Sequence, residues 1–211
     1  KTLLKFWQIK IHVKIAALIS STGYIKTGPK HQGPFTMSKV IDIFKKKPRT
    51  YSFELFPTKT DQGYQNLLKT IAALAKLDPD FISCTYGAGG GNREKTFDIV
   101  QHIQQAHNIT SVAHLTCVCH TKEEIRRILM EIQSRGIENV LALRGDPPKD
   151  QPDWRPGPEN FLYSGELCAF IRKNFGDHFA IGVAGFPEGH ILCPDRDQDA
   201  RFLKMKIDAG G

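Results

Sequence analysis

The sequence predicts an α/β fold with parallel strands, arranged either as a doubly wound sheet or as a (β/α)8 barrel. Five short apolar segments recur along the chain, centred near residues 54, 83, 114, 142 and 182. Segments with the periodicity of amphipathic helices separate them, and no hairpin signal stands between neighbouring strands. Strand and helix that alternate in this way imply parallel strands joined by helical crossovers.

Each apolar segment is too short for a buried helix and therefore favours a strand. The first segment is aromatic, carries one carboxylate at Glu54 and is closed by Pro57. The predicted strands cover residues 51–57, 80–87, 111–117, 139–144 and 179–184.

The predicted helices follow from apolar residues at helical spacing and from their start signals. Thr121 is followed three residues later by Glu124, which is the pattern of a capping box at the start of a helix. The other helices are expected over residues 61–76, 93–107, near 160–174 and 196–209.

The length leaves two architectures open. A (β/α)8 barrel needs eight units and about 250 residues, whereas these 211 residues supply five units. The chain therefore fits an open five-stranded sheet or an incomplete barrel. We expect residues 37–211 to form this one domain, with Met37 as a natural start of translation. Residues 1–36 are expected to be a disordered basic leader.

The net charge of +7 does not predict an acidic partner, because the excess lies in the leader. Residues 1–41 hold seven lysines and no acidic residue, which leaves 22 basic and 22 acidic side chains over residues 42–211. A neutral domain gives no reason to expect nucleic-acid binding. No apolar run approaches the length of a membrane span, so no membrane association is expected either.

The cysteines predict a reduced, cytoplasmic protein. Their number, five, is odd, and they include no CxxC pair, whereas a disulfide framework has an even and regularly spaced set. Cys117, Cys119 and His120 form one cluster without a second pair of ligands. Alternate positions at a strand end explain that cluster better than a metal site, so no metal is predicted.

Polar residues collect at the carboxyl ends of the predicted strands, where ligands bind in both architectures. Taken alone, His114 fits a core histidine and Asp146 fits a turn residue. Polar or aromatic groups at five strand ends favour a shared site instead. These groups are Glu54, residues 85–87, His114 with Thr116, residues 144–146 and residues 186–188.

Glu54 is the candidate with the clearest chemistry. A carboxylate inside an apolar strand is costly unless it is paired. Glu54 is therefore either a structural carboxylate in a salt bridge or a proton donor whose pKa burial raises from about 4.3 toward neutrality.

The segment Gly87–Gly91 follows a strand and precedes a helix, as a dinucleotide-binding loop does. Asn92 stands where the third glycine of that fingerprint belongs, and no acidic residue follows at the end of the next strand. A glycine-rich loop whose backbone approaches a flat or phosphorylated ligand explains the segment better.

Several of these motifs together resemble the methylenetetrahydrofolate reductase family of the bacterial type, from about residue 50 onward. The motifs are residues 52–57 (SFELFP), 85–90 (TYGAGG), 114–117 (HLTC), 141–146 (LALRGD), 186–190 (FPEGH) and 204–210 (KMKIDAG). The resemblance implies a (β/α)8 TIM barrel that binds FAD and acts in one-carbon metabolism. It also implies that hydride passes from NADH or NADPH to the flavin and then to methylenetetrahydrofolate, in a ping-pong reaction.

The resemblance assigns catalytic roles to two residues. Glu54 would be the general acid that protonates the folate and opens its methylene bridge to an iminium, a step that suits a carboxylic acid in an apolar strand. Asp146 would lie between flavin and pterin, and Thr85 would contact the nicotinamide substrate. Positions that would contact FAD are Tyr86, Ala88, His114, Arg144, Gly145, Asp146, Tyr163, Ser164, Phe186, His190, Asp199 and Lys206.

The family's last three strands have no counterpart in these 211 residues. They include a strand-six glutamine that contacts folate and nicotinamide, and without them strands one and five leave open edges. We therefore expect this polypeptide alone to be unstable or inactive and the full-length product to be the reductase, oligomeric as the family is. The alternatives are another α/β protein that binds a cofactor at Gly87–Gly91, or a non-catalytic fragment.

Overall fold

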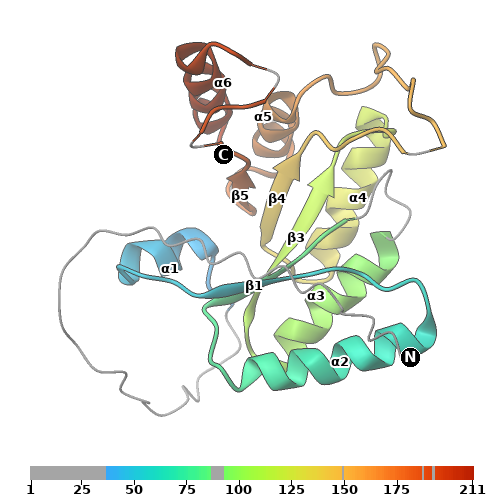
Figure 1. Ribbon diagram of the computed structural model, residues 1–211, viewed down its shortest axis with the longest axis vertical. Helices are drawn as coiled ribbons and strands as arrows, with labels where there is room; N and C mark the ends of the chain where they lie inside the picture. The colour runs from blue at the N-terminus through green and yellow to red at the C-terminus, as the bar shows by residue number, and fades with distance from the viewer. Residues whose placement is uncertain (1–36, 87–92, 149, 187, 192) are drawn as a thin grey trace, which may run out of the picture.

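The computed structural model describes residues 37–86, 93–148, 150–186, 188–191 and 193–211. The predicted leader, residues 1–36, lies outside the described residues, as does the predicted glycine loop from Gly87 to Gly91. In the described part, five strands alternate with helices along the chain, as the sequence predicts (Figure 1).

The five strands form one parallel sheet in the order β1-β2-β3-β4-β5. A doubly wound sheet reverses its strand order at a switch point, whereas the wall of a (β/α)8 barrel keeps the strands in chain order. The doubly wound alternative is therefore wrong, and the incomplete barrel is confirmed. The strands are β1 (Ser52–Leu55), β2 (Phe81–Cys84), β3 (Thr110–Thr116), β4 (Asn139–Leu143) and β5 (Ala180–Val183).

The predicted helices are present, with one boundary shifted. The helix expected near residue 160 begins at Ser164, because the side chain of Asn160 holds a turn by accepting from Gly157 N and donating to the carbonyl of His120. A further short helix, α1, was not predicted. The helices are α1 (Val40–Lys46), α2 (Asp61–Ala75), α3 (Arg93–His107), α4 (Lys122–Ser134), α5 (Ser164–Phe175) and α6 (Arg196–Asp208).

The start of α4 shows how the local sequence sets an element boundary. Thr121 accepts a hydrogen bond from Glu124 N at 3.2 Å, and the Glu124 carboxylate accepts from Thr121 N at 2.7 Å. This is the predicted capping box, and it places the preceding residues, 117–120, at the carboxyl end of β3.

The core lies between the sheet and the helices that follow its strands. Along β2 the buried residues are Ile82 and Cys84, and along β4 they include Val140 and Ala142, all of which belong to one hydrophobic core. Since side chains alternate across a strand, the residues between them point to the opposite face of the sheet, which is the interior face of a barrel wall. Glu54, Ser83 and His114 lie on this interior face.

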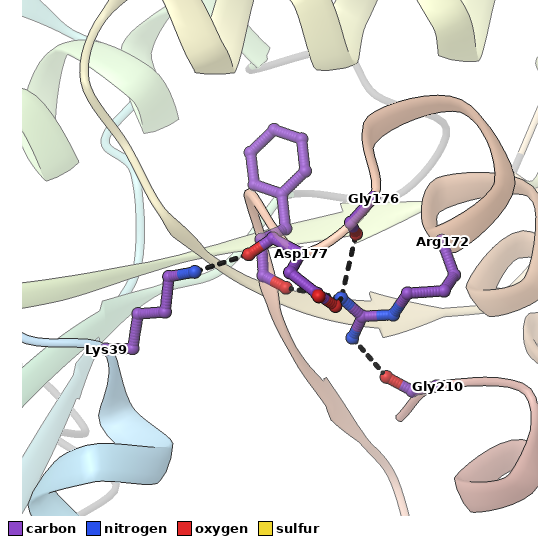
Figure 2. A network of polar contacts seen from close by, with 6 residues as sticks. Lys39, Arg172, Gly176, Asp177 and Gly210 are labelled. Atoms are coloured by element: carbon purple, nitrogen blue, oxygen red, sulfur yellow. Dashed lines mark hydrogen bonds and ion pairs between the residues drawn. The ribbon is translucent and has the colours of Figure 1, made fainter.

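Helix α1 lies across the amino-terminal ends of the strands. Val40 N donates to the Asn139 side chain at 2.8 Å, Thr110 donates to the Ser38 carbonyl, and Phe44 packs edge-on against Phe81. The Lys39 ammonium donates to the Asp177 carbonyl in the connection from α5 to β5 (Figure 2). This end of the sheet is therefore covered, and the carboxyl end remains for ligands.

Candidate functional site

The strand ends that carry the predicted site residues are held level by backbone hydrogen bonds beyond the sheet. Thr85 N donates to the Leu55 carbonyl at 2.9 Å, which sets the end of β2 beside the end of β1. Val118 N donates to the Arg144 carbonyl at 2.9 Å, which does the same for β3 and β4. Thr85 and Arg144 therefore lie at the same rim, as predicted.

Glu54 and His114 meet on the interior face. The Glu54 Oε2 and His114 Nε2 atoms are 3.5 Å apart, although β2 separates their strands. The His114 side chain is 7% exposed and the Glu54 side chain 30% exposed. Glu54 is thus less buried than predicted. Leu55 points into the hydrophobic core, whereas Glu54 points to the interior face of the sheet, which the helices do not cover.

Gly145 shapes the end of β4. Its φ of +80° lies in the left-handed region, and an added Cβ would come within 2.7 Å of Val118 Cγ1 and 2.8 Å of Thr116 Cβ. A larger residue would therefore be strained and would push β3 and β4 apart. Glycine at this position lets the chain turn sharply between Arg144 and Asp146.

Arg144 and Asp146 both point outward at this turn. Their side chains form an ion pair at 3.6 Å, with 52% of Arg144 and 92% of Asp146 exposed. Asp146 is thus available to a ligand, as its predicted role requires. An ion pair as exposed as this one adds little stability. Breaking it so that either side chain can contact a ligand therefore costs little free energy.

A cavity of about 290 Å³ opens beside the turn. Arg144, Gly145 and Tyr163, three of the predicted FAD contacts, line it. Ser164, another predicted contact, is the first residue of α5 and directly follows Tyr163. The β4–α5 connection therefore brings four predicted residues to one place.

The predicted contacts after β5 form another group. His190 N donates to the Asp199 carboxylate at 3.0 Å, and the rings of Phe186 and His190 pack edge-on at 4.8 Å. The Lys206 ammonium donates to the Ala184 carbonyl at 2.8 Å, at the end of β5. Asp199 and Lys206 both belong to α6, which follows this connection.

Two predicted contacts need separate comment. Ala88 lies outside the described residues. The Tyr86 side chain is 1% exposed and packs against Phe97 and His120 in the helix layer, away from the interior face. Burial raises the pKa of the Tyr86 hydroxyl, an effect that Arg93 nearby opposes. In this arrangement only the backbone of Tyr86 reaches the rim, since its side chain belongs to the core.

The cysteines lie within the described part of the chain, and three of them, Cys84, Cys117 and Cys168, are buried. All five are free, and no group of three or more His, Cys, Asp or Glu side chains among the described residues is placed to hold a metal ion. Burial raises the pKa of the Cys117 thiol to about 12, so its thiolate is scarce at neutral pH.

Sequence reasoning missed residues of the connecting loops. The proline-rich segment was treated as a loop only, yet Trp154, Arg155 and Pro156 line the cavity beside Arg144. A second hollow of about 370 Å³ lies after β1 and is lined by residues 56–60 and Gly63. Aromatic and cationic side chains inside a loop after a barrel strand are the signal that could have identified the first set.

The fold and the rim define a class: a parallel α/β protein with the strand order of a (β/α)8 barrel and with polar and aromatic groups at the carboxyl ends of its strands. The methylenetetrahydrofolate reductase family model matches residues 39–211. The chain therefore belongs to the methylenetetrahydrofolate reductase family.

Individual relatives agree with the family match. The chain is 43% identical over 166 residues to methylenetetrahydrofolate reductase 2 of Saccharomyces cerevisiae, covering 77% of this chain and 28% of the relative. It is 37% identical over 183 residues to methylenetetrahydrofolate reductase (NADH) 1 of Arabidopsis thaliana, covering 82% of this chain and 31% of the relative. The match to 5,10-methylenetetrahydrofolate reductase of Salmonella typhimurium is 37% over 162 residues, with 75% and 51% covered. The chain thus spans roughly a quarter to a half of these relatives.

Among the helices of the described residues, none has the length and apolar character that crossing a membrane requires.

Proposed function

We propose that this chain forms the flavin-binding part of an oxidoreductase that reduces 5,10-methylenetetrahydrofolate to 5-methyltetrahydrofolate. NADH or NADPH would supply the hydride through FAD in a ping-pong reaction. The observation that carries the proposal is the Glu54–His114 pair on the interior face of the sheet, at 3.5 Å. This contact supports the proposal because it holds the Glu54 carboxyl where a ligand in the barrel mouth can reach it.

The rim suits a flavin dinucleotide by its chemistry. The residues of the rim include the Arg144 guanidinium and the Lys206 ammonium, which match the phosphates of FAD. The aromatic rings of Tyr163 and Phe186 match its flat rings. Bound FAD would accept hydride from the nicotinamide and pass it to the folate. Arg144, Gly145, Tyr163 and Ser164 would hold it from the β4 side, and Phe186, His190, Asp199 and Lys206 from the β5 side.

The chain's own residues would supply the proton and position the substrates. Glu54 in its acid form would donate to the folate nitrogen, which opens the methylene bridge to an electrophilic iminium. His114 would hold the carboxyl toward the mouth, since its buried ring fixes one side of the contact. Asp146, which is almost fully exposed at the rim, would accept a hydrogen bond from the pterin. Thr85 would contact the nicotinamide at the neighbouring strand end.

The substitution Glu54→Gln tests this proposal in the full-length product of the gene that encodes this chain. Gln keeps the size and polarity of the side chain but carries no transferable proton. We expect folate reduction to fall by about 100-fold or more, while reduction of the flavin by NADH stays near its original rate. Stopped-flow absorbance of the flavin separates the two half-reactions. If both half-reactions were unaffected, Glu54 would not be the acid.

A parallel measurement addresses the nicotinamide substrate. The Arabidopsis thaliana and Zea mays relatives carry NADH in their names, which supports NADH for this protein as well. The values of kcat/KM for NADH and NADPH, measured on the same enzyme preparation, decide between the two.

A further inference from the structure

The amino-terminal end of the sheet carries a surface that the proposed chemistry does not use. Helix α1 crosses this end and stands apart from α4, α5 and α6 (Figure 1). From the last turn of α1 the chain reads KKKPR over residues 45–49, which places four cations among five consecutive exposed residues. Residues 41–51 are called the α1 surface below.

Positive charge is concentrated in this part of the chain. Residues 37–50 hold five cationic side chains and one acidic side chain, a net charge of +4. Residues 51–211 hold 18 cationic and 21 acidic side chains, a net charge of −3. The near-neutral sum over the domain therefore hides a positive patch at one end. Residues 1–36, with six lysines and no acidic residue, join the chain at this same patch.

Carboxylates of the described residues neutralise only part of the patch. Lys47 pairs with Asp80, whose side chain is 5% exposed. Lys45 lies 3.7 Å from an aspartate one turn earlier in α1, in an ion pair that is open to solvent and therefore weak. Lys46 and Arg49 form no ion pair with a carboxylate in the described part of the chain. Their charges remain for an anionic partner.

Apolar side chains stand among these cations. Ile41, Phe44 and Tyr51 are 49%, 51% and 62% exposed. Phe44 and Lys45 follow Ile41 by three and four residues, so the three side chains share one face of α1. Cations that surround exposed apolar side chains suit the interface of an anionic membrane. There the cations meet lipid phosphates, and the apolar groups enter the boundary of the acyl chains.

The α1 surface is fixed in place by the rest of the fold. Val40 N donates to the Asn139 side chain at 2.8 Å, and the Phe44 ring packs edge-on against Phe81 at 6.0 Å. A surface that is already ordered loses little conformational entropy when it binds. The surface lies at the opposite end of the strands from the rim, so a partner bound here leaves the rim accessible.

We propose that the α1 surface docks the protein on an anionic phospholipid membrane. Lys46 and Arg49 contact lipid phosphates, and Ile41 and Tyr51 enter the interfacial layer. Binding of this kind requires no membrane-spanning helix. The exposed Ile41 side chain favours lipid over nucleic acid, because contacts to a phosphate backbone make no use of an aliphatic group.

The test measures cosedimentation of the full-length product of the gene with phospholipid vesicles. Vesicles that mix phosphatidylcholine with phosphatidylglycerol should bind the protein, and vesicles of phosphatidylcholine alone should bind it far more weakly. Added salt should weaken the binding to anionic vesicles. The double substitution Lys46→Glu/Arg49→Glu should weaken it by about tenfold or more, because two attractive charges become repulsive.

A matched control and an apolar variant separate the two parts of the contact. Lys69→Glu/Arg127→Glu makes the same change of charge at exposed positions of α2 and α4 and should bind like the parent protein. Ile41→Gln keeps the charge and removes an apolar group, so it should weaken vesicle binding by about threefold. Circular dichroism confirms that each variant is folded.

Three results would overturn the proposal. The first is the absence of binding to anionic vesicles. The second is equal binding by the parent protein and Lys46→Glu/Arg49→Glu, which would place the contact in another part of the chain. The third is tighter binding to a duplex oligonucleotide than to the vesicles at the same salt concentration, which would make nucleic acid the partner. All three readouts are independent of folate reduction.

Discussion

The residue on which the proposed chemistry depends is positioned by a neighbour two strands away. Glu54 projects from β1 and meets His114 of β3 at 3.5 Å, with the shorter side chain of Ser83 on the strand between them. The ring of His114 is 7% exposed and is held in place by its surroundings, so it restricts where the Glu54 carboxyl can point. We expect this contact to position the carboxyl for the folate step.

His114→Asn tests this positioning role. Asn retains a polar side chain but is shorter than His, so the Glu54 carboxyl loses its partner on β3. The rate of folate reduction should fall by about tenfold, with little change in flavin reduction by NADH. Stopped-flow absorbance of the flavin follows the two half-reactions separately.

Ser83→Ala is the control on the same face of the sheet, because it alters the surroundings of Glu54 and leaves the Glu54–His114 contact in place. Its rates in both half-reactions should match those of the parent protein. If His114→Asn slowed both half-reactions equally, or neither of them, His114 would not position Glu54.

Residue types at strand ends were predictable because the carboxyl rim is a property of the fold class. The positions of Glu54, His114, Arg144 and Phe186 at this rim could be predicted before any contact was known. The orientation of the Tyr86 side chain could not be predicted, because a tyrosine at the end of a strand can face either the core or the ligand, and only packing decides between them. Here Phe97 and His120 hold it in the helix layer.

At the scale of elements, the β3–α4 connection combines a sharp turn with a partly buried histidine. Cys119 adopts a φ of +60°, and His120 follows it with Nε2 buried and without a hydrogen-bond partner among the described residues. Burial lowers the pKa of His120, with a further decrease from Arg93 and an opposing increase from Glu124. The capping box of α4 begins at the next residue, so helix and histidine are held together.

His120 should make the protein less stable in acid. Its pKa is lower in the folded state than the ordinary value of 6.5, so the unfolded chain binds the proton more readily. Stability is therefore fully present above about pH 6.5 and is lost as the pH falls toward the folded-state pKa. His120→Gln should show a weaker decrease of the unfolding free energy between about pH 8 and about pH 5.

Urea unfolding at several pH values gives the slope of the unfolding free energy against pH for the parent protein and for His120→Gln. Arg127→Gln, on the exposed face of α4, is the control and should keep the parent slope. An unchanged slope in His120→Gln would show that other groups cause the acid sensitivity.

Elements with strong periodicity were predictable, and the exceptions have physical reasons. Helix α1 has only seven residues and none of them is buried, so its short apolar segment does not distinguish a helix from other structure. The cavity wall at Trp154 and Arg155 lies in a proline-rich loop, where no period exists and loop folding decides which side chains point inward. Helix α5 begins late because side-chain bonds of Asn160 hold the preceding turn.

At the scale of the whole molecule, strand order decided between the two architectures that the sequence left open. Alternation of strand and helix is common to both, whereas order depends on long-range pairing that periodicity does not encode. The pairing of β4 with β5 also brings the ends of α5 and α6 together at the amino-terminal side of the sheet. A single arginine connects the segments there.

Arg172 joins three parts of the molecule (Figure 2). From α5, its guanidinium donates to the carbonyls of Gly176 at 2.8 Å and Phe179 at 3.3 Å, at the approach to β5, and to Gly210 at 2.7 Å, after α6. The adjoining Asp177 backbone carbonyl accepts from Lys39, which precedes α1. This network fixes the position of β5, the strand that precedes Phe186 and His190.

Arg172→Met should therefore destabilise the protein by about 2–3 kcal/mol, because three hydrogen bonds to carbonyls and one to the exposed Asp177 carboxylate are lost. Lys173→Met, the neighbouring exposed cation, should have little effect. Gly210→Ala attacks the same network from the other side, since its φ is +108° and an added Cβ would come within 2.7 Å of Arg172 Nε. Because both substitutions break one contact, their effects in urea unfolding should be less than additive. Full additivity would mean that Arg172 and Gly210 stabilise the protein independently and that the network does not act as a unit.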